Sequence, residues 1–481
     1  MAAREDDSPL LAARWLEECL SGSLGPNGGT TLVQQGDGSV RCVRGAAALR
    51  EAGTLHHDVQ PYLQLAHTLH EQAGDGSTTA VLLAARLVRQ ALEAVQAGLP
   101  AAASLDGYAL AQRQALASVR ALRTQDGGRS LATVAPHVAW TPLVLDGLRG
   151  LTRQGVLDLD AIDVRAEGDA ATWLDGLVAT PQWAPTCPPA GKGIALVAEE
   201  WKPRPLHDVT LRIQRADGLG GPGAAEDRLR ETAAAHVTAL GVGLLVCARG
   251  LDEGLCARLA SAGTLVWTDA PRHALRRLER CTGARLAPRV HRLATSDVGV
   301  ASSLARRPAR QGGWLVRGAG PSATLAVPAA TRAAQDSARD DAERLLRAAG
   351  LWLREPGAVP GGGRWQRAVA QALRSAADAA PGKAALAVRA AAAAVASLAD
   401  DLVRNAGGDP LAGGTAPGAQ DAWDGAATVH LTVGSAFATA RAILRVDARH
   451  AKRPSSQVGL RGGAGKVGSP RGLPGDIPPL M

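Results

Sequence analysis

Hydrophobic positions in the first 125 residues follow helical spacing, interrupted by short glycine-rich breaks. Apolar residues recur in this way from Leu10 to Leu20, which predicts a helix over residues 9–23. A break follows, and two apolar runs then flank a Gly-Asp-Gly turn at 36–38, which predicts a β-hairpin. Further helices are expected over 45–52, 58–72, 77–97 and 105–123. The N-terminal part is therefore predicted to be mainly helical.

The pattern changes in the middle of the chain, where short apolar runs alternate with helical stretches from about residue 192 to residue 327. The runs predict strands over 194–197, 209–213, 242–246 and 265–267, with helices over 225–239 and 252–262. Helical periodicity then returns over 334–354, 364–377, 383–404 and 430–442. This order predicts an α/β domain inserted between two helical halves.

Composition sharpens this picture and excludes several classes of protein. The 481 residues are enough for about three domains, and aromatic residues make up only 3%, so the core must be built from Ala, Leu and Val. No apolar run reaches the ~18–20 residues of a membrane helix, and the acidic N-terminus lacks the apolar region of a secretory signal. We therefore expect a cytoplasmic protein without membrane contact, whose six separated cysteines are reduced and buried.

The basic balance of the chain says little about its partners. A net charge of +8 is mild for this length, so it permits an acidic partner without arguing for nucleic acid. Part of it comes from residues 451–481, which are rich in Gly and Pro and carry five basic residues against one acid. We expect this tail to be disordered.

The strongest candidate for chemistry is the run Gly-Asp-Gly-Ser-Thr-Thr from Gly74 to Thr79, which opens the helix expected at 77–97. Glycines let the backbone approach an anion, and the free N–H groups and positive end of a helix favour phosphate. Asp75 in that turn can hold a divalent cation that bridges phosphate oxygens. The alternative is an ordinary helix cap with Asp-Gly turn chemistry. The run is not a P-loop, because no Gly-Lys-Ser/Thr follows.

Two other polar clusters each have a functional and a structural interpretation. Asp340 and Asp341 lie in the helix expected at 334–354, where a carboxylate can orient or deprotonate a water or simply belong to a solvated acidic face. His56, His57 and Asp58 are adjacent, and adjacent residues point to different faces of a helix, so we expect no metal site there. The sequence contains no G-x-S-x-G, H-E-x-x-H or Rossmann fingerprint.

Several motifs follow one another in a fixed order. Ser-Leu-Gly-Pro-Asn-Gly (23–28) precedes the hairpin, and the 74–79 run opens a long apolar helix. The middle of the chain adds the segments 241–247 and 278–284, and the later motifs are Val-Pro-Gly-Gly-Gly (359–363), Arg-Asn-Ala-Gly-Gly-Asp-Pro (404–410), Ala-Trp-Asp (422–424) and Ala-Ile-Leu-Arg-Val-Asp (442–447). From about residue 9 to residue 450, this series resembles the group II chaperonins, the family of the thermosome and the eukaryotic cytosolic chaperonin.

The resemblance implies a multidomain α and α/β subunit, in which an α/β apical domain is inserted into a small intermediate hinge domain and a mostly helical equatorial domain. The implied segments are 1–135 and 358–450 for the equatorial domain, 136–192 and 328–357 for the intermediate domain, 193–327 for the apical domain and 451–481 for the tail. Such subunits bind ATP, hold non-native or specific client proteins, and assemble into rings with identical or paralogous subunits.

The resemblance also implies roles for individual residues. Asp75 is implied to hold Mg2+, and Asp341 falls where the family has the carboxylate that activates the attacking water. The residues implied to surround ATP are Gly25 and Pro26 beside the nucleotide, Gly74, Gly76, Ser77, Thr78 and Thr79 around the phosphates, and Gly362 and Asp424 near the ribose.

The sequence departs from the family at positions that matter for hydrolysis. A second Asp that positions the water is replaced by Arg44, which cannot act as a base near neutral pH. The family's lysine shortly after the segment 131–135 is missing, and Asp340 replaces the usual His beside the catalytic Asp. The apical protrusion, normally helical and acidic, contains Leu-Gly-Gly-Pro-Gly at 219–223, which is poor helix material.

Two functions stay open on the sequence alone. One is an ATP-driven folding subunit, supported by Asp75, Asp341 and the Ser-Thr-Thr run. The other is a chaperonin-derived scaffold or partner-binding protein with weak or no ATP turnover, because losing a water-positioning carboxylate raises the barrier by several kcal/mol. Few large apolar side chains remain for gripping unfolded clients, which also favours the second. We expect a protein that binds ATP and Mg2+, assists protein folding and has a partly degraded hydrolytic site.

Overall fold

The computed structural model describes most of the chain. The described residues are 8–34, 38, 40–51, 56–125, 130–131, 140–152, 157–186, 189, 191–202, 221–308, 311–329, 331–412 and 414–446. The chain divides into two units, Met1–Leu444 and Arg445–Met481, and all elements named below belong to the first. The tail expected at 451–481 and the strand expected at 209–213 lie outside the described residues.

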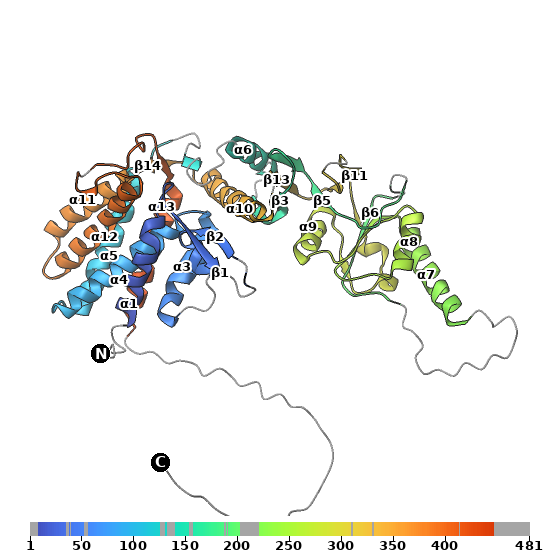
Figure 1. Cartoon of the computed structure of the whole chain (residues 1–481), viewed down its shortest axis with the longest axis horizontal. Coiled ribbons are helices and arrows are strands. Elements are labelled where there is room, and N and C mark those ends of the chain that lie inside the picture. The colour runs from blue at the N-terminus through green and yellow to red at the C-terminus, as the bar shows by residue number, and fades with distance from the viewer. Residues whose placement is uncertain are drawn as a thin grey trace, which may run out of the picture. The chain divides into compact units, whose positions relative to one another are not determined.

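Long helices from both ends of the chain pack around one shared core (Figure 1). Helix α4 lies among them and contacts α1, α3, α12 and α13. The helices are α1 (Ser8–Leu20), α3 (Gln60–Ala73), α4 (Ser77–Gln96), α5 (Ala101–Ala121), α11 (Arg364–Ala379), α12 (Ala384–Asn405) and α13 (Ala426–Ile443). The helices predicted in both halves of the chain are therefore confirmed, and they form one helical body.

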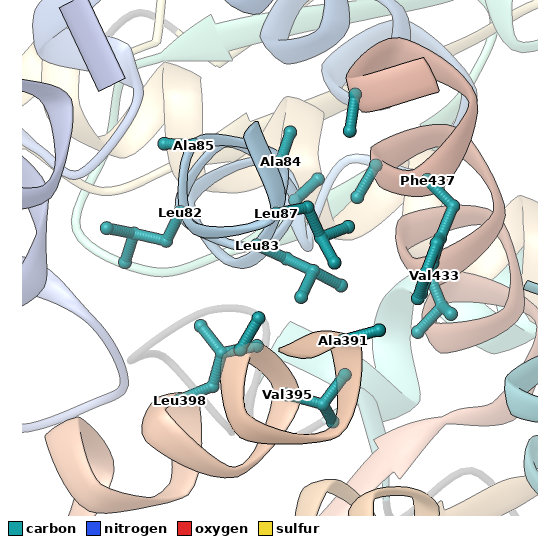
Figure 2. Close-up of a cluster of buried hydrophobic side chains, with 14 of the residues drawn as sticks. Leu82, Leu83, Ala84, Ala85, Leu87, Ala391, Val395, Leu398, Val433 and Phe437 are labelled. Atoms are coloured by element: carbon teal, nitrogen blue, oxygen red, sulfur yellow. The ribbon is translucent and has the colours of Figure 1, made fainter. Parts of the chain in front are cut away.

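Helix α4 is buried on all sides from Ala80 to Val88. Figure 2 shows Leu83 and Leu87 of α4 facing Val395 of α12 and Phe437 of α13. A helix that is apolar on nearly all sides, here with Arg86 as the exception, is a buried helix, and alanines among the leucines let its neighbours approach closely. The Ala, Leu and Val core that the composition predicts is the core that the structure has.

A second group of elements connects the helical body to the middle of the chain. Its three-stranded sheet has the order β3-β13-β4, in which β13 runs parallel to β3 and antiparallel to β4. Helices α6 and α10 contact this sheet and each other. The bounds are β3 (Ile162–Ala166), β4 (Thr172–Asp175), β13 (Ala323–Val327), α6 (Trp140–Leu151) and α10 (Arg332–Arg354). The sequence predicted α10 here but neither α6 nor the sheet.

The predicted α/β region forms a sheet of order β10-β6-β7-β8, with β9 beside β6 and buried clusters against its helices. A small sheet, β11-β12-β5, adjoins it. The bounds are β5 (Leu177–Ala179), β6 (Gly193–Val197), α7 (Gly221–Ala239), β7 (Val242–Cys247), α8 (Glu253–Ser261), β8 (Leu265–Trp267), α9 (Arg272–Thr282), β9 (Leu286–Ala287), β10 (Gly299–Val300), β11 (Ser303–Arg306) and β12 (Trp314–Arg317).

One expectation for this region needs correction. Residues Gly221, Pro222 and Gly223, which we took as poor helix material, form the first turn of α7. Proline is compatible with the first turn of a helix, because the N–H groups there have no intrahelical partner. The poor helix formers therefore start this helix rather than interrupt it.

The remaining elements are short. The predicted hairpin is present as β1 (Thr30–Gln34) and β2 (Val40–Arg44), and α2 (Ala47–Glu51) follows it. Strand β14 (Ala358–Pro360) pairs with β15 (Trp423–Gly425), so the Val-Pro-Gly-Gly-Gly and Ala-Trp-Asp motifs lie side by side. No described helix is long and apolar enough to cross a membrane. Among the described cysteines, Cys247, Cys256 and Cys281 are free and buried as expected, whereas Cys19 is exposed.

Candidate functional site

The turn from Gly74 to Gly76 joins α3 to α4. Gly74 and Gly76 have φ values of +67° and +79°, a conformation that residues with a side chain rarely adopt. A Cβ on Gly76 would lie 2.2 Å from Thr432 Oγ1, and one on Gly74 would lie 2.3 Å from the carbonyl oxygen of Arg344. The turn is therefore held tightly between α13 and α10, with the half-exposed Asp75 at its tip.

The first turn of α4 carries Ser77, Thr78 and Thr79. Its N-cap is Gly76, which supplies no side-chain cap, so backbone N–H groups at this end are open to an anion. Thr78 Oγ1 accepts a hydrogen bond of 3.0 Å from the backbone N–H of Ala46. This contact attaches the end of the β1–β2 hairpin to the start of α4.

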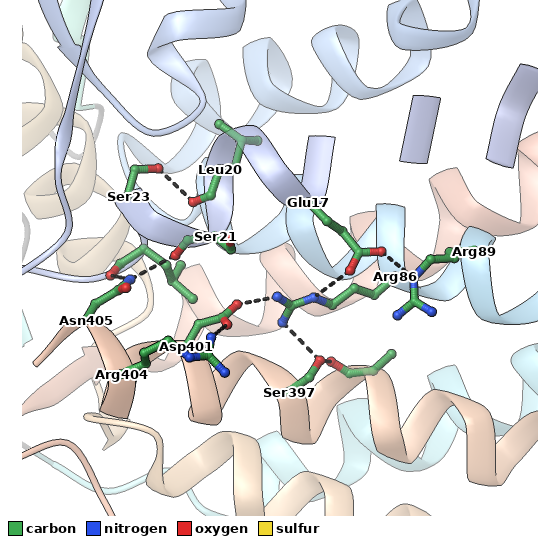
Figure 3. A network of polar contacts seen from close by, with 12 residues as sticks. Glu17, Leu20, Ser21, Ser23, Arg86, Arg89, Ser397, Asp401, Arg404 and Asn405 are labelled. Atoms are coloured by element: carbon green, nitrogen blue, oxygen red, sulfur yellow. Dashed lines mark hydrogen bonds and ion pairs between the residues drawn. The ribbon is translucent and has the colours of Figure 1, made fainter. Parts of the chain in front are cut away.

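The second glycine turn, which includes Gly25 and Pro26, is fixed from two sides. The Arg44 guanidinium donates to the carbonyl oxygens of Pro26 (2.9 Å) and Gly28 (2.8 Å). Asn405 Nδ2 donates to the carbonyl oxygens of Ser21 (2.8 Å) and Leu24 (2.9 Å), just before the turn (Figure 3). The Arg44 guanidinium is therefore engaged with the carbonyls of this turn.

Helix α10 brings Asp341 to the Gly74–Gly76 turn through Arg344, one helical turn further along. Arg344 Nη1 lies 3.6 Å from Asp341 Oδ1, and Arg344 Nη2 lies 3.5 Å from Asp75 Oδ1. Arg344 Nε also donates to the carbonyl oxygen of Gly74 at 3.2 Å. Two predicted site residues from distant parts of the chain thus share one guanidinium.

Asp424 lies on β15 and completes a third side of this region. Trp365 Nε1 donates a 2.9 Å hydrogen bond to Asp424 Oδ2. Burial, and then the negative charge of Asp75, raises the pKa of Asp424 to about 6. Gly362 lies in the neighbouring turn, where a Cβ would meet the Cβ of Ala419 at 2.5 Å. The carboxylate of Asp75 thus contributes to the raised pKa of Asp424.

A pocket lies beside Asp75. Its lining comes from the ends of α10 and α13, the segment Ser130–Leu131 and the turn before β14: Asp75, Ser130, Leu131, Ala348, Leu351, Trp352, Glu355, Gly357, Gly425, Ala427 and Thr428. Motifs from both halves of the chain therefore meet around the Gly74–Gly76 turn.

Cationic side chains surround His70 on the other side of the turn. Burial, then the charges of Arg50, Arg347 and Arg344 in that order, and then His67, lower the pKa of His70 to about 3. His70 is therefore neutral over the whole physiological range of pH. Arg344 and Arg347 are themselves paired with carboxylates.

His56, His57 and Asp58 come together at the entrance to α3. His56 Nδ1 lies 3.5 Å and His57 Nε2 3.7 Å from Asp58 Oδ2, with the carboxyl buried and both rings exposed. The geometric argument against a metal site, that adjacent residues diverge on a helix, is wrong here. The segment is a short 3-10 turn (His57–Val59) preceded by His56, so its side chains converge.

Sequence reasoning missed three side chains that shape the site, namely Arg344, Trp365 and Thr432. Arg344 had one usable signal, since a residue three positions after Asp341 lies on the same face of a helix. Trp365 and Thr432 had none, because each reaches the site only through contacts between segments far apart in sequence. Thr432 Oγ1 is buried and, among the described residues, has no hydrogen-bond partner.

Comparison with known proteins places these features in a family. The profile of the TCP-1/cpn60 chaperonin family matches residues 16–142 and 200–416. The thermosome subunit beta of Desulfurococcus mucosus is 26% identical over 434 residues, which cover 84% of this chain and 86% of that protein. The thermosome subunit alpha of Methanothermobacter thermautotrophicus is 23% identical over 426 residues, covering 84% of this chain and 79% of that protein.

A solved structure is similar to this chain over nearly its whole length. It is a crystal structure of a group III chaperonin in the open state, with a TM-score of 0.73 and 21% sequence identity. The match covers 92% of this chain and 98% of the other. The fold is therefore the chaperonin fold, mostly helical with several mixed sheets.

Proposed function

Since the chain belongs to the TCP-1/cpn60 chaperonin family, we propose that it is an ATP-binding protein that assists protein folding and has a partly degraded hydrolytic site. The observation that carries this proposal is the meeting of Asp75 and Asp341 at one guanidinium. These residues occupy the positions implied to hold Mg2+ and to activate the attacking water. The guanidinium that they share joins α10 to the α3–α4 turn, which supports one site rather than two unrelated acidic segments.

The residues around the turn fit a Mg2+–nucleotide. A Cβ on Gly76 would collide with Thr432, so packing requires glycine there, and the first N–H groups of α4 have no side-chain cap and can bind phosphate. In this proposal Asp75 holds the cation, residues 74 and 76–79 hold the phosphates, and Gly25 and Pro26 border the nucleotide. Gly362 and Asp424 lie on the ribose side. When bound, Mg2+ supplies positive charge to the phosphate oxygens.

Asp341 has the chemistry of the group that orients the water. Its carboxyl is largely buried at 15% exposure and lies 3.6 Å from the Arg344 guanidinium. A carboxylate can accept a hydrogen bond from water and direct the oxygen at phosphorus.

The partly degraded hydrolysis rests on Arg44. A second water-positioning carboxylate would stand at this position, and the side chain instead donates to the carbonyls of Pro26 and Gly28. Asp341 is therefore the one carboxylate left to position the water. This favours tight binding with slow turnover, and its limiting case is the alternative function, a non-hydrolysing chaperonin-derived scaffold or partner-binding protein.

The proposal extends to domains, partners and location. The equatorial domain consists of residues 1–135 and 358–450, the intermediate domain of 136–192 and 328–357, and the apical domain of 193–327. Client proteins bind the apical domain, and identical or paralogous subunits complete a ring in the cytoplasm. The thermosome subunits and group III chaperonin to which the chain is similar support this assignment.

The test is steady-state ATP hydrolysis and ATP binding by the purified wild-type chain and by Asp341→Ala. We expect slow turnover in the wild type, at least ~100-fold less in the variant because a positioned general base contributes ~10²–10⁴-fold, and unchanged ATP binding. Asp336→Ala is the matched control, since Asp336 is exposed on the same helix. ATP binding without turnover in the wild type would establish the scaffold, and no binding at all would overturn the proposal.

A further inference from the structure

The Arg344 side chain occupies the place beside Asp75 where a cation is expected. Its guanidinium lies between the carboxylates of Asp75 and Asp341, and its Nε donates to the carbonyl oxygen of Gly74. We propose that Arg344 is a built-in counter-ion that competes with the divalent cation for Asp75 and thereby ties α10 to the α3–α4 turn until a metal–nucleotide binds. This inference rests on the proposed function and names how its site is regulated.

The contacts of Arg344 have the geometry of an exchangeable ion pair. Distances of 3.5 and 3.6 Å to the two carboxylates exceed those of direct charge-assisted hydrogen bonds. The Arg344 and Asp75 side chains are 29% and 39% exposed, so water screens their attraction. Such a pair contributes only ~0–1 kcal/mol, and a doubly charged cation with phosphate ligands can displace it.

The local charge explains why a counter-ion is needed without a metal. Asp75 and Asp341 share Arg344, and the charge of Asp75 is also felt by Asp424, whose pKa it helps to raise. Negative groups brought this close repel one another unless a cation lies between them. Arg344 supplies that charge from α10, and this contact links α10 to the turn in the metal-free chain.

A second arginine on the same face of α10 pairs with other carboxylates. Arg347 pairs with Glu71 of α3 at 3.7 Å and with Glu343 at 3.3 Å. Arg347 therefore contacts α3 through Glu71 and not through a proposed metal ligand. Arg344 is the residue whose partner a metal takes, which makes Arg347 a matched control.

The geometry permits a second role with the opposite consequence. If Arg344 turned towards the nucleotide and contacted a phosphate, it would add to nucleotide affinity instead of opposing the metal. The two roles predict opposite effects of removing the guanidinium. Competition predicts tighter Mg2+–nucleotide binding in Arg344→Gln, and phosphate contact predicts weaker binding.

The experiment is calorimetric titration with ADP, with and without Mg2+, for the wild type, Arg344→Gln and Arg347→Gln. We expect Arg344→Gln to bind Mg2+–ADP about 2–5-fold more tightly, while its affinity for ADP without Mg2+ and the behaviour of Arg347→Gln stay at wild-type values. The reason is that an exposed ion pair of ~0–1 kcal/mol no longer has to be broken, and each 1.4 kcal/mol is tenfold.

Amide hydrogen exchange of α10 gives a readout independent of affinity and activity. In the wild type, we expect amide exchange over residues 338–350 to become faster when Mg2+–ADP is added. In Arg344→Gln, we expect the same fast exchange already without any ligand. The inference is overturned if Arg344→Gln binds Mg2+–ADP no more tightly than the wild type, or if amide exchange without ligand is the same in both proteins. Either result leaves the proposed function standing. A wild type that binds no nucleotide under any condition overturns both.

Discussion

Two arginine–carboxylate clusters connect α4 and its preceding turn to helices from the C-terminal half. They differ in burial and in how closely the charged groups approach each other. In the first, Arg86 of α4 hydrogen bonds directly to Asp401 of α12, both side chains being only 5–6% exposed (Figure 3). Glu17, Ser397 and Arg404 satisfy their remaining atoms. In the second, Arg344 lies at ion-pair distance from Asp75 and Asp341 in a half-exposed setting.

The comparison indicates that the Arg86 cluster stabilises the fold and that the Arg344 cluster belongs to the candidate site. A buried pair with all its hydrogen bonds made cannot exchange partners without exposing a charge to the apolar interior, so it fixes the packing of α1, α4 and α12. Loosely held carboxylates that share one cation near solvent can accept another cation at small cost. The same residue types thus serve structure in one place and exchange in the other.

The largest effect is expected from breaking the buried pair. Arg86→Gln leaves Asp401 and Glu17 with less compensation in the interior, and the free energy of unfolding should fall by about 3–5 kcal/mol. The measurement is the midpoint of urea unfolding. Arg389→Gln is the control, because its pair with Asp378 is exposed and its loss should cost no more than ~0.5 kcal/mol. Equal effects of the two substitutions would contradict the structural role of Arg86.

The next effect tests whether the turn at Asp75 is as rigid as its contacts indicate. Gly76→Ala places a Cβ 2.2 Å from Thr432 Oγ1 at a φ of +79°, and it should cost about 2–4 kcal/mol and abolish nucleotide binding. Gly98→Ala is the control, since Gly98 has a φ of +98° but open space around it. It should cost only ~1–2 kcal/mol and leave binding intact. A Gly76→Ala protein that binds nucleotide normally would show that the turn adapts.

Local sequence patterns predict some of the elements that hold these two clusters. The long helices follow from apolar periodicity, and the Gly74–Thr79 run identifies itself through local turn chemistry, so both can be predicted. The resemblance adds Asp341 and Asp424, which no local pattern distinguishes from an ordinary acidic helix or turn.

What could not be predicted depends on contacts between distant segments. The partner of Arg86 lies 315 positions away, and that of Trp365 lies 59 away. The short strands of the β3-β13-β4 sheet give periodicity too brief to recognise. The convergence of His56, His57 and Asp58 was misjudged because a helical spacing was assumed for a segment that forms a 3-10 turn.

A pH experiment tests the coupling of carboxylates within the site. The pKa of Asp424 is about 6 in the folded chain, raised by burial and by Asp75 above its value of about 4 when unfolded. Its contribution to stability is therefore fully present below about pH 4 and is lost as pH rises to 6 and above, with a slope of at most ~1.4 kcal/mol per unit.

The measurement compares urea midpoints from pH 4 to pH 8 for the wild type and Asp424→Asn. The asparagine cannot ionise, so the variant should gain on the wild type as pH rises through 4–6 and keep a constant advantage above 7. Asp75→Asn removes one cause of the shift and should move this window to lower pH. A difference between wild type and Asp424→Asn that does not change with pH would show that Asp424 titrates normally.

The smallest effect is expected at the exchangeable cluster itself, and it sharpens the contrast with Arg86. Arg344→Gln removes a half-exposed ion pair, so the free energy of unfolding should change by less than ~1 kcal/mol in the same urea experiment. Removing the guanidinium leaves Asp75 in contact with water, and Asp341 keeps a smaller contact with it. A loss comparable to that of Arg86→Gln would place Arg344 among the structural pairs. It would also mean that its contact with Asp75 is too strong for a metal to displace.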